Sequence, residues 1–173
     1  MSKYKLHRVL KKYQLLRNKQ FVNFADAKKI LIFIQGESLQ ELNKTSFNIK
    51  EKITDKEIVI LGFIKKLSKK ENLDSIQFEK LITKKDLNFW NNPKKKDIEW
   101  CFSQNSDILI NLDLTSSNVL NILTAASSSK IKCGCKSKYY NIFDLIINIT
   151  SEKEKDILLE QILFYLNTIQ VKN

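Results

Sequence analysis

Seven polar side chains stand where two apolar stretches of the sequence end. They follow the stretches at residues 30–34 and 107–112, and they are Gln35, Glu37, Ser38, Asp113, Thr115, Ser116 and Asn118. Continuous apolar stretches are typical of strands in parallel sheets, whose ligands bind at the carboxyl ends of the strands. The backbone amides that open a helix there can also hold an anion. The sequence therefore offers a ligand site for a nucleotide, a sugar or a phosphate.

A structural role for the same residues is the stronger expectation. Thr115 or Ser116 has a side chain of the kind that caps a helix, and we expect Asp113 to be solvated. An acidic group at that position would repel an anion unless a cation or a ligand hydroxyl accompanied it. We therefore favour helix capping at residues 113–118 and keep ligand binding as the alternative.

Residues that carry common catalytic reactions are scarce. The single histidine, His7, precedes the predicted core, so a histidine-based triad or general base is not expected. Gly36, Gly62 and Gly134 are isolated and form no glycine-rich phosphate loop. The sequence thus predicts no catalytic residue and no cofactor, and it favours a non-catalytic domain over an enzyme.

The cysteines do not complete a metal site. Cys133-Gly134-Cys135 has the form of half a zinc site, but only Cys101 and His7 could add thiol or imidazole ligands to it. An odd number of cysteines also argues against a disulfide scaffold. We expect ordinary thiols, with Gly134 allowing a bulge or close packing, and no bound metal.

Strands and helices alternate along the sequence. Apolar runs predict strands at 30–34, 57–64, 76–83, 107–112, 130–135 and 143–149, and helical spacing predicts helices at 38–53, 94–104, 116–127 and 152–170. This order is typical of βαβ units. The predicted fold is α/β, a doubly wound, mostly parallel sheet of five to six strands, Rossmann-like or flavodoxin-like. The link at 136–142 is short for a parallel crossover, so we allow for one antiparallel edge strand.

A basic helix leads the chain. Its apolar stripe has helical spacing and comprises Leu6, Val9, Leu10, Tyr13 and Leu16. Residues 1–20 hold seven of the 30 basic residues and no acid, so 23 basic and 19 acidic groups remain and the charge falls from +11 to +4. We divide the chain into a basic amphipathic N-terminal helix at 1–24 and a single α/β domain at 25–173.

This leading helix is the predicted contact element. Its stripe, within residues 3–20, can pack on the domain, on a second copy in a homo-oligomer, or on another protein partner. Nucleic acid and a membrane surface are less favoured alternatives. Lysine outnumbers arginine 28 to 2, which points to coding bias as one source of the charge, since base readout favours arginine.

Two tryptophans flank a polar, basic segment. Trp90 and Trp100 stand on either side of Asn91-Asn92-Pro93 and of three lysines at 94–96. Aromatic side chains beside lysines can bind single-stranded nucleic acid. The sequence has one such cluster and does not repeat it, so we expect instead that Trp90 closes the core under a loop.

No targeting or membrane-spanning segment is predicted. The basic start lacks the uninterrupted apolar core and the cleavage site of a signal peptide. No apolar run approaches the roughly 18 residues of a membrane span. The cytoplasm is the expected location.

Five segments of the chain are familiar in combination. They are 84–90 with Pro93, 107–112, 132–134, 143–147 and 161–166. Together they resemble an uncharacterised Bacteroidetes family of short α/β proteins, a domain of unknown function, over nearly the whole chain. The resemblance implies the fold and no activity. Residues 107–134 are also similar to part of the first half of heptosyltransferase-type sugar transferases, which we attribute to shared architecture.

Overall fold

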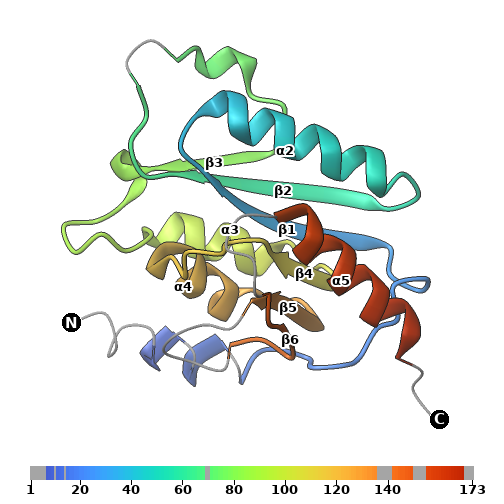
Figure 1. Cartoon of the computed structure of the whole chain (residues 1–173). Helices are drawn as coiled ribbons and strands as arrows, with labels where there is room; N and C mark the ends of the chain where they lie inside the picture. Colours follow the sequence, from blue (N-terminus) through green and yellow to red (C-terminus); the bar gives the residue numbers. More distant parts are fainter. Residues whose placement is uncertain are drawn as a thin grey trace.

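One parallel sheet organises the protein. The computed structural model describes residues 7–169 except 10, 14, 69–70, 136–141 and 150–154. Its strands are β1 (Lys29–Gly36), β2 (Glu57–Ile64), β3 (Lys80–Thr83), β4 (Ile108–Asn111), β5 (Ile131–Cys135) and β6 (Leu145–Ile147) (Figure 1). They lie in the order β3-β2-β1-β4-β5-β6, and every neighbouring pair is parallel. The predicted α/β fold is confirmed, and this strand order is the Rossmann-like one.

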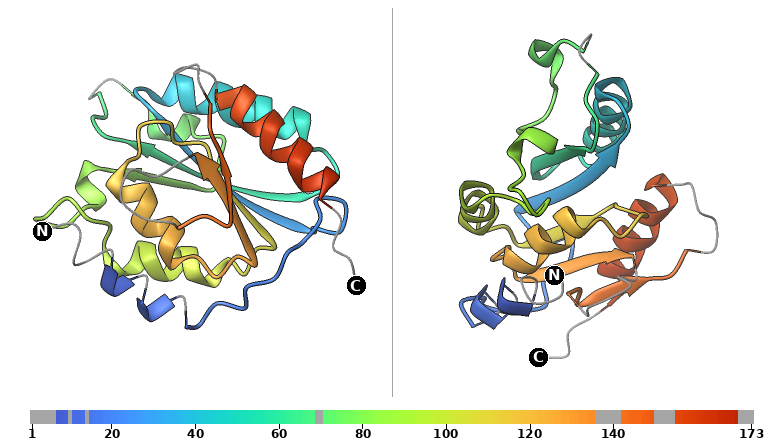
Figure 2. Two further views of the ribbon diagram at one scale, coloured as in Figure 1. Left: turned by 60° about the horizontal axis from the view of Figure 1, so that its bottom comes forward. Right: turned by 90° about the vertical axis from the view of Figure 1, so that its left-hand side faces the viewer.

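Helices cover both faces of the sheet. The four α-helices with defined bounds are α2 (Leu39–Lys52), α3 (Lys95–Ser103), α4 (Asn118–Ala126) and α5 (Lys155–Thr168), and short 3-10 turns form η1 (Leu73–Ser75) and η2 (Lys84–Asp86). Helices α2 and α5 lie on one face, whereas α3 and α4 lie on the other (Figure 2). Within the described ranges, no helix combines the length and the apolarity needed to cross a bilayer.

The central strand β1 explains the apolar run at its position. Ile30, Ile32 and Ile34 pack in the core with α2 and α5, while Leu31 and Phe33 pack in the core with α3 and α4. Because both faces of the strand are buried, every position in this run must be apolar. Ligands of such sheets bind where the order reverses, which here is between the carboxyl ends of β1 and β4.

Carboxylates join the strands at the opposite, amino edge. The Oδ2 atom of Asp107 accepts hydrogen bonds from the backbone N–H groups of Lys28, at 2.8 Å, and Lys29, at 3.1 Å. Asp144 Oδ2 accepts the Lys132 N–H at 2.8 Å. Burial alone would raise the pKa of Asp107, but hydrogen bonds from Lys130, Lys28 and Lys29 hold it below its ordinary value. These acids therefore stabilise the strand entries while ionised.

Both edges of the sheet differ from the sequence-based expectation. The last strand, β6, is parallel to β5, so the expectation of an antiparallel edge is wrong. The third strand begins at Lys80 and not at residue 76. The Gln77 carbonyl instead accepts hydrogen bonds from Ser46 and Lys50 of α2, which occupies the backbone that would otherwise pair with β2.

The leading segment packs on the domain and is helical over a shorter range than predicted. Residues 7–9 and 11–13 are helical, and a turn at 15–16 follows. Val9 is buried in the core with α3 and α4, and Tyr13 packs against this core. The centroids of the Tyr13 and Phe102 rings are 5.3 Å apart. Leu16 is 58% exposed, so its place in the apolar stripe is wrong; Leu6 and Leu10 lie outside the described residues.

Arg17 explains why the helix does not continue to residue 20. Its guanidinium donates hydrogen bonds to the carbonyls of Ser129, at 2.7 Å, and Lys130, at 2.8 Å. It also forms an ion pair with Asp144. These partners lie on the β5 side of the domain, and the backbone at 17–20, which is not helical, brings the arginine to them. Tertiary contacts therefore override the helical pattern at this point.

Candidate functional site

We call the place where the carboxyl ends of β1 and β4 meet and the strand order reverses the β1–β4 crevice. At the end of β1 the chain occupies its own backbone amides. Ser38 Oγ accepts the Glu41 N–H at 3.1 Å as the N-cap of α2. Glu41 Oε2 accepts the Glu37 N–H at 2.9 Å, and Glu71 Oε1 accepts the Leu39 N–H at 2.6 Å. In Rossmann-like proteins this helix N-terminus is the position that receives phosphate. Here carboxylates of the chain itself take that place.

A lysine of α5, on the same face of the sheet as α2, also binds at this end of β1. Lys155, at the start of α5, donates from Nζ to the Gln35 carbonyl at 2.5 Å and to Glu41 Oε1 at 2.6 Å. Burial alone would raise the pKa of Glu41, but the hydrogen bond and charge of Lys155 and the Glu37 amide lower it. The Glu41 carboxylate is therefore held ionised between a cation and a backbone amide.

At the end of β4, Asp113 organises the turn into α4. Its side chain is buried, and Oδ1 accepts from the Thr115 N–H at 2.8 Å and from Thr115 Oγ1 at 2.7 Å. Oδ2 accepts the N–H of Ser117, the N-cap residue, at 2.5 Å. The expectations that Asp113 is solvated and that Thr115 or Ser116 caps the helix are therefore wrong. Asp113 holds the turn because its carboxylate can satisfy several donors at once.

The remaining predicted residues join this turn to its neighbours. Asn118 Nδ2 donates to Asn92 Oδ1 at 3.1 Å, which ties α4 to the loop before α3. Ser116 has a positive φ of 57° and its carbonyl accepts from Asn121 Nδ2 at 3.4 Å. All seven predicted residues thus lie at the carboxyl edge, in one group after β1 and one after β4. Their ligand-binding role stays a prediction.

A hollow at the carboxyl edge was not predicted. It lies beyond the ends of β2 and β3, has a volume of about 570 Å³, and is lined by Lys65, Lys66, Leu67, Ser68, Glu71, Leu73, Thr83, Lys84 and Lys85. We call it the lysine cavity. Among the described residues, its four lysines have no carboxylate within ion-pair distance. Glu71 is turned to the Leu39 and Ser68 amides instead.

A signal for the lysine cavity was present in the sequence. Lys65-Lys66 directly follows β2, and Lys84-Lys85 directly follows β3. The rule that led to the residues after β1 and β4 applies equally to these two strand ends. The pairs become neighbours because β2 and β3 are parallel and adjacent, with Ile64 opposite Thr83.

A tight turn beside the lysine cavity carries exposed aromatic rings. Asn88 N–H donates to the Asn92 carbonyl at 2.9 Å, while Asn88 Oδ1 accepts the N–H groups of Trp90, at 3.0 Å, and Asn92, at 3.2 Å. The exposed fraction is 92% for Phe89 and 57% for Trp90. The expectation that Trp90 closes the core is wrong, because the turn is built from asparagine hydrogen bonds and holds the rings outward. We call residues 87–93 the aromatic turn.

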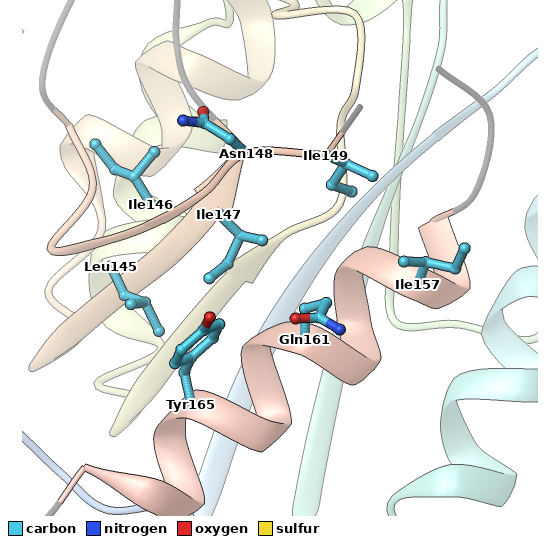
Figure 3. Close-up of a pocket in the computed structure, with 8 residues that line it drawn as sticks. All are labelled: Leu145, Ile146, Ile147, Asn148, Ile149, Ile157, Gln161 and Tyr165. Atoms are coloured by element: carbon cyan, nitrogen blue, oxygen red, sulfur yellow. The ribbon is translucent and has the colours of Figure 1, made fainter. Parts of the chain in front are cut away.

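A separate groove runs along the edge strand β6. Its volume is about 410 Å³, and Leu145, Ile147 and Ile149 face Ile157, Gln161 and Tyr165 of α5 across it (Figure 3). Ile146 and Asn148 point to the other side of the strand (Figure 3). The groove combines apolar walls with amide and phenol groups and offers no acid–base pair among its lining residues.

The core holds a lysine and two thiols that sequence reasoning did not single out as buried. Lys132 is 1% exposed, and its Nζ donates to the Ala125 carbonyl at 3.1 Å. Burial, assisted by the charge of Arg17, lowers the pKa of Lys132 to about 7. Burial raises the pKa of the Cys101 and Cys133 thiols, so neither is an activated nucleophile.

The thiols belong to the packing of the sheet. A Cβ atom at Gly134 would lie 2.6 Å from Phe143 Cε1, which explains the glycine between Cys133 and Cys135. In the part of the chain that the structure describes, no three His, Cys, Asp or Glu side chains group in a way that could hold a metal ion.

Comparison with known proteins identifies a family. No curated protein matches the chain significantly. A model of a family of unknown function, DUF6913, matches residues 1–169 and so covers the sheet, its helices and the leading segment. The chain belongs to the family of unknown function DUF6913.

Proposed function

We propose that the protein is a non-catalytic binding domain that takes up a polyanion at its carboxyl edge through the lysine cavity. The observation that carries this proposal is the group of four exposed lysines around one hollow of about 570 Å³, with no carboxylate paired to any of them in the described residues. A hollow lined by charges of one sign raises the local concentration of ligands of the opposite sign.

The contrast with Lys155 supports this role. Lys155 occupies a comparable place at the end of β1, but Glu41 and a carbonyl consume its hydrogen-bonding capacity. Within the part of the chain that the structure describes, the ammonium groups of Lys65, Lys66, Lys84 and Lys85 have no such partners and stay open to solvent or a ligand. Lysine provides point charges without the planar fork of arginine, which suits contacts to phosphate or sulfate groups rather than recognition of one particular group.

Paired substitutions at the cavity test the proposal. Lys84→Gln/Lys85→Gln should weaken binding of inorganic polyphosphate and reduce the slope of log K against log salt by roughly two, because each lysine contact releases about one counterion. Lys28→Gln/Lys44→Gln removes the same charge at exposed positions away from the cavity and serves as the matched control. An equal loss in both variants, or no binding by the unaltered protein, would refute a specific role for the cavity.

The leading segment is a second candidate contact element. Arg8, Lys11 and Lys12 are exposed, whereas Val9 and Tyr13 contact the core, so a basic face points outward from the domain. A protein partner, or a second copy of the chain, engaging residues 3–20 would meet this face. Arg8→Gln/Lys11→Gln/Lys12→Gln should then change the sedimentation behaviour or the capture of that partner while leaving polyphosphate binding at the cavity unchanged.

A small ligand in the β1–β4 crevice is the third candidate. Gln35 Oε1 is buried there without a hydrogen-bond partner in the described part of the chain, which a ligand donor could satisfy. Thermal-shift screening with nucleotides and sugar phosphates tests this, and Gln35→Leu should abolish any stabilisation. The cytoplasm as the place of action and a Bacteroidetes origin stay predictions from the sequence.

A further inference from the structure

We propose that the aromatic turn stacks on the bases of single-stranded nucleic acid while lysines on both sides of it contact the phosphates. This inference rests on the proposed function, because the lysine cavity supplies part of the backbone contact. It adds the class of polyanion and assigns the contact with the bases to Phe89 and Trp90.

The first support is the exposure of two rings on a backbone that is held in place. The turn is closed by a bridge between Leu87 and Pro93 and by the hydrogen bonds of Asn88. Asn91 adopts a positive φ of 55°, and Asn92 and Pro93 are buried. Two apolar rings held in solvent by an ordered turn give up the stabilisation that burial would provide. A ligand that covers the rings would provide this stabilisation, and it would not have to order the loop because the turn is already formed.

The second support is the position of the lysines relative to the rings. Lys84 and Lys85 precede the turn, Lys94, Lys95 and Lys96 follow it, and all five are exposed. Lys94 Nζ donates to the Lys85 carbonyl at 2.8 Å, so the two sides meet at the base of the turn. The partners of Lys95 and Lys96 are Glu99, at 3.4 Å, and Asp86, at 3.8 Å, and exposed pairs of this kind are weak. A strand that crosses the rings would therefore meet positive charge before and after them.

The third support is the orientation of the rings. Phe89 and Trp90 have centroids 5.9 Å apart and planes at 85°, so their faces point in different directions. Each ring can therefore receive a separate base, and stacking of this type tolerates any base because every base has a π-face. In a duplex the base faces are already stacked on one another, which makes a single strand the better fit.

A membrane surface fits these residues less well. The turn offers two apolar side chains next to Asn88 and Asn91, which is little apolar area for insertion between lipids. A single strand requires no more than this, because stacking on one or two aromatic residues beside basic groups is a common mode of binding. Anionic vesicles therefore enter the experiment as the competing outcome.

The experiment measures binding of a fluorescent oligothymidylate of about 12 nucleotides, a length within the site sizes of single-strand binding proteins. Phe89→Ala/Trp90→Ala should weaken binding about 10- to 100-fold, as expected when stacking is lost. Phe164→Ala/Tyr165→Ala is the matched control, because these residues form a similar exposed pair on α5, with centroids 5.5 Å apart and planes at 78°. That control should leave the affinity unchanged.

Four further measurements separate the outcomes. A duplex of equal length and inorganic polyphosphate should bind more weakly than the single strand, and Phe89→Ala/Trp90→Ala should not affect them. In a Trp100→Phe background, the oligonucleotide should quench the emission of Trp90. Equal affinity of the aromatic variant for the single strand would overturn the stacking proposal while leaving the lysine cavity intact if polyphosphate still binds. Selective loss of binding to phosphatidylserine vesicles, without loss for the oligonucleotide, would overturn it in favour of a membrane.

Discussion

Two neighbouring parts of the carboxyl edge differ in how their charged groups are satisfied. At the crevice between β1 and β4 the charged groups are satisfied internally, since Glu41, Asp113 and Lys155 bond to amides, a hydroxyl, a carbonyl or each other. Gln35 Oε1 is the exception there within the described residues. The lysine cavity beyond β2 and β3 leaves four ammonium groups to solvent. Both lie at the edge where ligands of parallel sheets bind, so position alone does not distinguish them.

This difference indicates that the polar contacts of the β1–β4 crevice contribute to stability, whereas the lysines of the cavity do not. A hydrogen bond between two groups of the same chain stabilises the fold, and removing one partner leaves the other unsatisfied. An unpaired, exposed lysine contributes little to stability. We therefore expect substitutions in the crevice to lower the free energy of unfolding, and substitutions at the cavity to leave it unchanged and to alter binding.

Lys132 tests the comparison most strongly, because it places the residue type of the cavity inside the core. Its lowered pKa means that the unfolded chain binds more protons than the folded one between about pH 7 and pH 10.5. The loss of folding stability caused by burying Lys132 is therefore complete below pH 7 and becomes smaller as the pH rises. Lys132→Met should raise the free energy of unfolding by roughly 3 to 5 kcal/mol more at pH 6 than at pH 10.5. Urea denaturation at both pH values measures it, and an equal effect at both would contradict the burial of a neutral amine.

Asp113 is expected to give the next largest effect. Asp113→Ala leaves the Thr115 and Ser117 amides and the Thr115 hydroxyl without their acceptor. We expect a loss of about 3 kcal/mol in the free energy of unfolding, measured by urea denaturation at neutral pH. Asp113→Asn keeps one acceptor oxygen and should lose less. Polyphosphate binding should remain, and its disappearance in a folded variant would mean that the two parts of the edge act as one.

Glu71 lines the lysine cavity and also occupies the N-terminus of α2 through the Leu39 amide. Glu71→Ala removes the acceptor of the Leu39 and Ser68 amides and should cost about 1 to 2 kcal/mol. It also frees the N-terminus of α2 for an external anion. Inorganic phosphate should therefore raise the melting temperature of the variant more than that of the unaltered protein. Glu71→Gln, which retains an oxygen, is the control and should gain less.

The smallest effect on stability is expected at the cavity itself. Lys65→Gln/Lys66→Gln should change the free energy of unfolding by less than about 0.5 kcal/mol, as is usual for exposed charges without partners. The same variant should lose affinity for polyphosphate. A large loss of stability would show that these lysines carry structural contacts, and the contrast between the two parts of the edge would fail.

The elements governed by burial were predictable from the sequence, and those governed by polar contacts were not. The strand at 57–64 has its predicted limits because continuous apolar residues mark a strand buried on both faces. The leading helix is shorter than its pattern because Arg17 binds residues more than 100 positions away, which no local pattern contains. Trp90 is exposed because Asn88 builds a turn, although tryptophan is usually an interior residue.

The candidate site divides in the same way. The rule of strand ends placed Gln35 and Asp113 at the correct edge, because it depends only on parallel pairing. Whether such residues bond to one another depends on side-chain geometry, as with the Asp113 carboxylate and the Ser117 amide. The Lys65-Lys66 and Lys84-Lys85 pairs become one cavity only when β2 and β3 are neighbours.

The contacts of Arg17 have a consequence for the newly made chain. During synthesis Arg17 leaves the ribosome before its partners Ser129, Lys130 and Asp144, which follow 112 to 127 residues later. Strands β1 and β2 can pair long before then, because they begin only 28 residues apart in sequence, at residues 29 and 57. Arg17 is therefore without these partners while β1 and β2 pair. The ion pair and hydrogen bonds of Arg17 on the β5 side can form only after the chain has been made through Asp144.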